Sequence, residues 1–237
     1  LIQHRENGII KSKETFVNEE MKGTYEYYHE NGKLRQSGCI INTFKDGEIL
    51  SYYKSGISKS IETYILGIRS GPRKYFYEDG IVSQEGKDKD NLRVGLWTWY
   101  YTNGKKMKQE LYKISIGFPV PTLKKRINWL EGGQKVSEIE HEDTLNHGKY
   151  IVWYKNGNKK QHSIYKSNKL DGKWIEWHRN GIKRAKGNML YGMMDGKWTF
   201  WYHNGNKELE CEFDFGNPVG GAIIYHDSGV LKEEINF

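Results

Sequence analysis

The feature that most constrains this chain is a ten-residue segment that recurs every 24 residues. Gly196–Gly205 reads GKWTFWYHNG, Gly172–Gly181 reads GKWIEWHRNG and Gly148–Gly157 reads GKYIVWYKNG. A short repeat of this kind is typical of chains in which each unit packs mainly on its neighbours in sequence. The 237 residues therefore do not have to enclose one large globular core.

A glycine marks the end of each copy, and the residue before it is most often Asn. Successive glycines stand 24 residues apart, except for one interval of 29. Asn-Gly and Asp-Gly pairs favour two-residue type I′ hairpin turns, in which both central residues have positive φ. The pattern predicts ten hairpins, with turns at Gly8, Gly32, Gly56, Gly80, Gly104, Gly133, Gly157, Gly181, Gly205 and Gly229.

The residues between the glycines alternate as in a β-strand, with an aromatic residue four positions before nine of the ten turns. In a two-residue hairpin this aromatic residue pairs with the residue three positions after the turn glycine. We therefore expect pairs such as Trp153–Lys160 and Trp177–Arg184. The fold class that follows is all-β: an elongated, single-layer antiparallel sheet of about ten 24-residue hairpin repeats.

The longer interval interrupts the repeat. Its segment GFPVPTLKKR contains Pro119 and Pro121, and proline cannot donate a hydrogen bond to a sheet ladder. We therefore expect repeats 1–5 over residues 1–116, an irregular insertion loop over 117–126, and repeats 6–10 over 127–237.

The composition fits an ordered sheet with little enclosed core. Charged residues make up 28% and mean hydropathy is −0.83, yet 14% of the residues are aromatic, which argues against disorder. The net charge of +7 permits an anionic partner without requiring one. No run of five like charges occurs, so nucleic acid is not an expected partner. In an extended array, Cys39 and Cys211 are too far apart for a disulfide.

The pattern G-x-W/Y-x-x-W/Y-Y/H-x-N-G-K resembles the variant MORN repeat of bacterial proteins, many of them described as antitoxin-like components of toxin–antitoxin systems. The resemblance extends from Asn7-Gly8 to Ser228-Gly229. It implies a twisted antiparallel sheet of successive hairpins that serves as an interaction or membrane-proximal module. It supplies no catalytic residues.

No other motif indicates chemistry. Asp214-Phe215-Gly216 spells the kinase DFG tripeptide, but the glycine-rich loop, strand lysine and HRD loop of a kinase do not accompany it. A phosphate-binding GxxxxGK[ST] loop does not occur either, and the histidines are spread over separate repeats. We therefore expect no enzyme activity and no catalytic, cofactor or metal site.

The candidate binding residues are aromatic residues of the outgoing strands and basic residues that follow the turns. Alternation places Trp198, Phe200 and Tyr202 together on a face that varies between copies. The full set is Trp97, Trp99, Tyr150, Trp174, Trp198, Phe200, Tyr202, Lys159, Lys160, Lys183 and Arg184. Cross-strand packing and solubility would also explain these residue types.

Two functions are compatible with this surface. The first is a non-enzymatic scaffold, antitoxin-like or adhesion-like, that binds a protein partner. The second is a module that docks on anionic phospholipid through the basic residues. Unpaired strands at the ends of the sheet also lead us to expect end-to-end self-association. The chain starts at Leu1 inside a repeat, so we expect the native N-terminus to be missing, with bacterial cytoplasm and cell surface as alternative locations.

Overall fold

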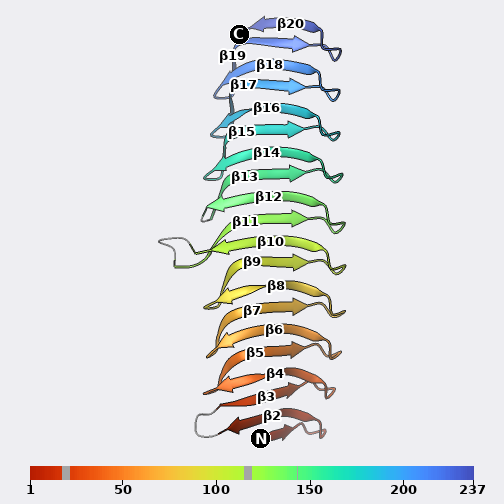
Figure 1. Cartoon of the computed structure of the whole chain (residues 1–237), viewed down its shortest axis with the longest axis vertical. Helices are drawn as coiled ribbons and strands as arrows, with labels where there is room; N and C mark the ends of the chain where they lie inside the picture. Colours follow the sequence, from red (N-terminus) through yellow and green to blue (C-terminus); the bar gives the residue numbers. More distant parts are fainter. Residues whose placement is uncertain (18–21, 115–118, 143) are drawn as a thin grey trace. The chain divides into compact units, whose positions relative to one another are not determined.

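The computed structural model describes residues 1–17, 22–114, 119–142 and 144–237. These residues form strands and turns, and none of them lies in a helix. The chain divides into two compact units, Leu1–Pro121 and Thr122–Phe237. Figure 1 labels the strands in chain order.

The described residues of the first unit form ten strands, and each pairs antiparallel with the next in sequence. They are β1 (Ile2–His4), β2 (Ile10–Val17), β3 (Lys22–Tyr28), β4 (Leu34–Ile41), β5 (Phe44–Tyr52), β6 (Ser58–Ile65), β7 (Ile68–Phe76), β8 (Val82–Lys89), β9 (Leu92–Tyr100) and β10 (Lys106–Lys113).

The second unit has the same organisation, with ten further strands in chain order. They are β11 (Thr122–Trp129), β12 (Lys135–Glu142), β13 (Leu145–Trp153), β14 (Lys159–Lys166), β15 (Lys169–Trp177), β16 (Lys183–Leu190), β17 (Met193–Trp201), β18 (Lys207–Asp214), β19 (Asn217–Tyr225) and β20 (Leu231–Asn236). The expected all-β architecture of antiparallel hairpin repeats is confirmed.

Part of the loop expected over residues 117–126 is a strand in the structure. Strand β11 begins at Thr122, so the second half of that segment belongs to the sheet. Both Pro119 and Pro121 lie before β11, where neither has to donate a ladder hydrogen bond. Residues 117 and 118 lie outside the described residues.

The Asn-Gly turns are not two-residue type I′ turns, and that prediction was wrong. Between β3 and β4, His29 donates its backbone N–H to Lys33 at 2.8 Å, and Gly32 donates to His29 at 3.0 Å. In this loop only Gly32 has positive φ, at 79°. The geometry is a three-residue loop closed by a glycine bulge.

The extra loop residue shifts the pairing by one position next to the loop, and from Val152–Gln161 on the pairing is the one expected. Trp153 pairs with Lys159 instead of Lys160. Trp177 likewise pairs with Lys183 instead of Arg184. The residue three positions after the glycine lies in the bulge, without a direct partner on the opposite strand.

Asparagine precedes the turn glycine because its side chain forms two bonds in this loop. The Oδ1 atom of Asn204 accepts the backbone N–H of Asn206 at 3.0 Å, while its Nδ2 donates to the carbonyl of Asp227 in the next hairpin at 2.7 Å. The same bond to the next hairpin recurs at Asn31, Asn156 and Asn180. The asparagines therefore connect successive turns.

Two-residue turns with positive φ at both central positions occur at the opposite ends of the strands. Asn42 and Thr43, with φ of 48° and 70°, connect β4 to β5. The same conformation occurs at Leu66-Gly67, Asp90-Asn91, Ser167-Asn168, Tyr191-Gly192 and Phe215-Gly216. The last of these shows that the DFG tripeptide contributes to a hairpin turn.

A bulge bends the outgoing strands β5, β7, β9, β13, β15, β17 and β19 near their starts. In β17, Gly196, Lys197 and Trp198 together lie opposite the single residue Gly187 of β16. Gly196 has φ of 68°, a conformation that glycine adopts without strain. The bulge brings Trp198 onto the neighbouring strand, where only 2% of its surface is exposed.

Candidate functional site

The two faces of each unit carry different side chains. We call them the Trp198 face and the Trp201 face, because these two residues lie on opposite sides of β17. In the second unit the Trp198 face contains the buried core of Ala185, Trp198, Cys211 and Ala222. A single-layer sheet thus buries side chains within its own bent face.

Trp198 fits this core because glycine lies beneath it. A Cβ atom at Gly187 would lie 2.2 Å from the indole ring, so no larger residue fits there without displacement. The indole Nε1 donates to the carbonyl of Asn188 at 3.1 Å, and the ring stacks on Phe200 with centroids 5.9 Å apart. Trp198 therefore holds the face together instead of lying open to solvent.

Trp97 has the same environment in the first unit. It is fully buried, lies over Gly86, and donates its Nε1 hydrogen to Lys87 at 3.0 Å. The guanidinium carbon of Arg73 lies 4.4 Å from its ring centroid. Trp99 is half-buried beside Trp97, with the ammonium of Lys108 3.9 Å from its ring centroid.

A buried ion pair accompanies Trp97. Asp88 is 1% exposed, and its carboxylate lies 2.9 Å from the guanidinium of Arg73, which is 8% exposed. The Nε of Arg69 lies 3.9 Å from the same carboxylate. Asp88 stands where most repeats have an apolar or aromatic residue, and this break in the column is the sequence signal for the pair.

The remaining aromatic candidates are half-buried. Tyr150 makes an edge contact with Tyr165, with centroids 5.7 Å apart. Trp174 packs against the core of the second unit together with Phe200. Tyr202 belongs to a turn, where its hydroxyl donates to the carbonyl of Tyr225 at 2.9 Å. Trp174, Trp198 and Phe200 thus lie together, whereas Tyr202 connects two hairpins.

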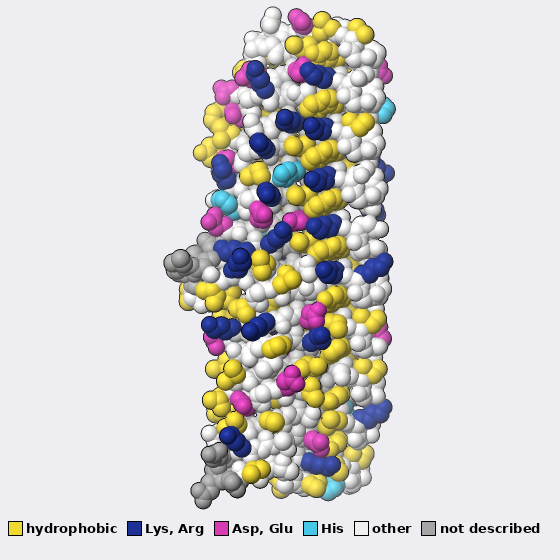
Figure 2. Space-filling model, viewed as in Figure 1, with side chains coloured by type: hydrophobic (Ala, Val, Ile, Leu, Met, Phe, Trp, Pro, Cys, Tyr) yellow, Lys and Arg dark blue, Asp and Glu magenta, His cyan; other side chains and the backbone are white. Residues whose placement is uncertain are grey.

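The basic candidates are all exposed. Lys159 and Lys183 lie on the Trp201 face, paired across the hairpin with Trp153 and Trp177. Figure 2 shows this column of the second unit as hydrophobic side chains alternating with Lys and Arg. Lys160 lies in a bulge, and Arg184 is engaged with Glu176 at 3.0 Å.

An apolar surface that the sequence did not single out surrounds the core of the second unit. Its half-buried members lie on β16, β17 and β18 of the Trp198 face. We call this the C-terminal apolar surface, and define it as Met189, Met194, Phe200, Leu209 and Phe213. Contiguous apolar surface of this kind is typical of interaction sites.

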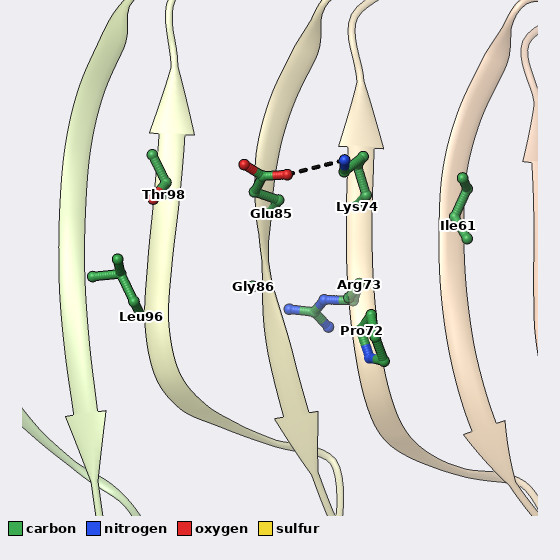
Figure 3. Close-up of a pocket in the computed structure, with 8 residues that line it drawn as sticks. All are labelled: Ile61, Pro72, Arg73, Lys74, Glu85, Gly86, Leu96 and Thr98. Atoms are coloured by element: carbon green, nitrogen blue, oxygen red, sulfur yellow. Dashed lines mark ion pairs between the residues drawn. The ribbon is translucent and has the colours of Figure 1, made fainter.

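Shallow depressions occur on the Trp201 face of each unit, over the bulges. The depression of the first unit has a volume of about 470 Å³ and is lined by residues of β6 to β9 (Figure 3). Lys74 and Glu85 form an ion pair of 3.1 Å across it. The second unit has a depression of about 500 Å³ at the matching position, lined by β15, β16 and β17.

Across the described part of the chain, no three His, Cys, Asp or Glu side chains gather as a metal site would require. Within the described ranges, no helix has the length and hydropathy needed to cross a bilayer. Cys39 and Cys211 are free cysteines.

Stacked hairpins, turn-to-turn hydrogen bonds and a bent face with its own core define a β-hairpin repeat protein. Residues 21–42, 93–113, 146–167 and 194–214 each match the sequence profile of the family described as MORN repeat variant. The chain is thus a MORN-repeat protein of the variant type. Such repeats generally act as modules that bind proteins or membranes.

Similarity beyond the family is weak. No curated protein matches the chain. The crystal structure of TcdB2-TccC3-Cdc42 aligns with 94% of this chain at 12% identity and a TM-score of 0.23, and the chain spans 15% of its length. A porin-like protein from Bacteroides uniformis ATCC 8492 aligns over 94% of this chain and 92% of its own length, at 9% identity and a TM-score of 0.24. At these scores neither structure informs the function.

Proposed function

We propose that this protein is a non-enzymatic scaffold that binds a protein partner through the C-terminal apolar surface. The observation that carries the proposal is the contiguity of the half-buried side chains of Met189, Met194, Phe200, Leu209 and Phe213 around a buried core. A sheet face of this kind is normally covered by a second layer. A protein partner would supply that layer, and either an antitoxin-like or an adhesion-like role would use it in the same way.

The test compares two pairs of apolar substitutions on opposite faces of the second unit. Phe200→Ser with Phe213→Ser changes the C-terminal apolar surface, whereas Ile175→Ser with Ile223→Ser makes a matched change on the Trp201 face. The tagged full chain is expressed in the cells that encode it, and co-purified proteins are quantified by mass spectrometry. A partner lost only from the phenylalanine variant supports the proposal. Equal capture by both variants, with unchanged melting temperatures, contradicts it.

A second function is favoured by the exposed lysines of the Trp201 face. Lys159, Lys160 and Lys183 are exposed, and the structure of the described residues shows no carboxylate partner for any of them. Docking on anionic phospholipid would use this row, because juxtaposed lysines attract acidic headgroups. Sedimentation with vesicles containing acidic lipid, compared with neutral vesicles over a salt series, tests this function. Absence of salt-sensitive sedimentation contradicts it.

Self-association through the strand edges is part of the same proposal. Strand β20 pairs with β19 along one of its edges, and β1 pairs with β2 in the same way. Among the described residues no strand pairs with the other edge of either one, and an edge of this kind offers backbone groups to another copy. Analytical ultracentrifugation over a concentration series measures this association, and a monomer at all concentrations contradicts it.

A further inference from the structure

The depression on the Trp201 face of the second unit has an unusual lining. We call it the lysine depression; it is lined by Lys173, Trp174, Ile175, Lys186, Gly187, Asn188, Lys197 and Thr199. Lys173, Lys186 and Lys197 belong to three successive strands, β15, β16 and β17. Strands in a sheet are about 4.8 Å apart, so the Cα atoms of the outer two lysines lie roughly 10 Å apart, with the third between them.

The equivalent depression of the first unit shows which part of this arrangement the fold requires. Glycine and threonine occupy matching places in both, as Gly86 and Thr98 in the first unit and Gly187 and Thr199 in the second. The three lysine positions differ completely, because the first unit has Pro72, Glu85 and Leu96 there. The depression is therefore a feature of the repeat fold in both units, whereas the three lysines occur only in the second.

A neighbouring depression supports the same distinction. It has a volume of about 310 Å³ and includes Lys197, but Glu210 and Glu212 also line it. Its balance of charge is therefore acidic, whereas the lysine depression has only cationic ionisable groups in its lining. Adjacent depressions of the second unit thus differ in the sign of the charge that lines them.

Within the described part of the chain, the three lysines also form no ion pair. In the first unit Lys74 is neutralised by Glu85 at 3.1 Å, and on β18 Glu210 is occupied by Lys207 at 2.8 Å. Among the described residues, no ion pair or hydrogen bond holds the ammonium groups of Lys173, Lys186 and Lys197, although Glu212 lies opposite Lys197 on β18. Three like charges around one hollow repel each other, and an anion bound between them would relieve that repulsion.

We propose that the lysine depression binds a compact ligand that carries several phosphate groups. Lysine binds phosphate as a point charge, and three such charges around a hollow fit a ligand with several phosphate oxygens facing them. Asn188 and Thr199 supply neutral hydrogen-bonding groups, and Ile175 supplies apolar surface. The volume of about 500 Å³ falls in the range of small-molecule sites, roughly 300–1,000 Å³.

The experiment is calorimetric titration of the full chain with inorganic triphosphate at low ionic strength. The variant K173A/K186A/K197A removes the three lysines of the depression. The control K155A/K169A/K232A removes the same number of charges from exposed positions of the same unit that lie outside the depression. Because both variants alter exposed side chains, circular dichroism melting should show both to be folded.

We expect the unmodified chain to bind triphosphate saturably. The affinity should fall about tenfold or more in K173A/K186A/K197A, because three charge-assisted contacts are lost. The control should change affinity by less than about twofold, since its charges are distant and screened. Absence of saturable binding, or equal losses in the two variants, overturns the proposal. Vesicles containing phosphatidylinositol bisphosphate identify the source of the phosphate: sedimentation that triphosphate reverses indicates a lipid headgroup, and triphosphate binding without sedimentation indicates a soluble ligand.

Discussion

Replacement of Gly187 by Ala tests how the bent sheet buries Trp198. The new Cβ atom would lie 2.2 Å from the indole, whereas ordinary contact begins at 3.4 Å, so the ring or the strand must move by more than 1 Å. Gly187 is not among the residues with positive φ, and the substitution therefore introduces a steric conflict without backbone strain. The expected response is displacement of Trp198.

Gly187→Ala lowers the free energy of unfolding in two ways. Overpacking of a core typically costs about 1–3 kcal/mol. Loss of the 3.1 Å hydrogen bond from Trp198 to Asn188 adds about 0.5–1.5 kcal/mol. Alanine restricts the unfolded chain and offsets up to about 1 kcal/mol of this. We expect the free energy of unfolding to fall by about 1–3 kcal/mol.

Urea unfolding of the full chain, followed by circular dichroism, measures this change. Gly221→Ala is the matched control, because its Cβ would lie no closer than 3.3 Å to any neighbouring atom and its φ is not positive. It should change stability by less than about 1 kcal/mol. In a Trp198→Val background the cost of Gly187→Ala should largely disappear, since the smaller side chain leaves room. Equal costs in the two backgrounds would refute the steric explanation.

Three further perturbations test other contacts. Asp88→Ala leaves the buried guanidinium of Arg73 without its 2.9 Å partner and should cost about 3–5 kcal/mol in urea unfolding, with recovery when Arg73→Leu is added; no recovery contradicts the ion pair. Burial, together with a glutamate hydrogen bond, raises the pKa of Tyr75 and of Tyr100 from the ordinary 10.0 to about 12. The folded state therefore holds these protons more tightly, so stability is full below pH 10 and falls towards pH 12; the double change to Phe should flatten this fall in thermal melts, and an equally steep fall argues against it. Asn204→Ala removes bonds of 3.0 and 2.7 Å and should cost about 1–3 kcal/mol in urea unfolding, with Asn204→Asp intermediate because it keeps one acceptor; equal effects of the two changes would contradict the turn-to-turn bond.

The hairpin repeats could be predicted because their signals are local and recur in phase. Glycine at two fixed positions, an aromatic residue between them and period-two alternation each indicate the same strand. The turn type could not be predicted from the Asn-Gly pair, because that pair serves two purposes. In this fold asparagine supplies side-chain bonds to its own loop and to the next hairpin, while the true type I′ turns include Thr43 and Leu66, residues that rarely adopt positive φ.

The candidate site could be predicted only in part. Trp97 and Trp198 were expected to be available on a face of an open sheet, but the bulges near the starts of β9 and β17 bury them. The signal that could have revealed this is the glycine eleven residues earlier, Gly86 and Gly187, which leaves space for an indole on the adjacent strand. The lysine depression could not be anticipated, because it depends on three strands that the bend brings around one hollow.

The proposal that a partner binds the C-terminal apolar surface is tested most directly by site-specific photo-crosslinking. A photoreactive phenylalanine analogue replaces Phe213 on the Trp198 face or, in a parallel variant, Ile175 on the Trp201 face, and the full chain is irradiated in the cells that encode it. We expect position 213 to give a discrete crosslinked protein that mass spectrometry identifies, and position 175 to give none of it. Crosslinks from position 175 alone, or none from position 213 in a normally folded chain, would contradict a partner bound at this surface.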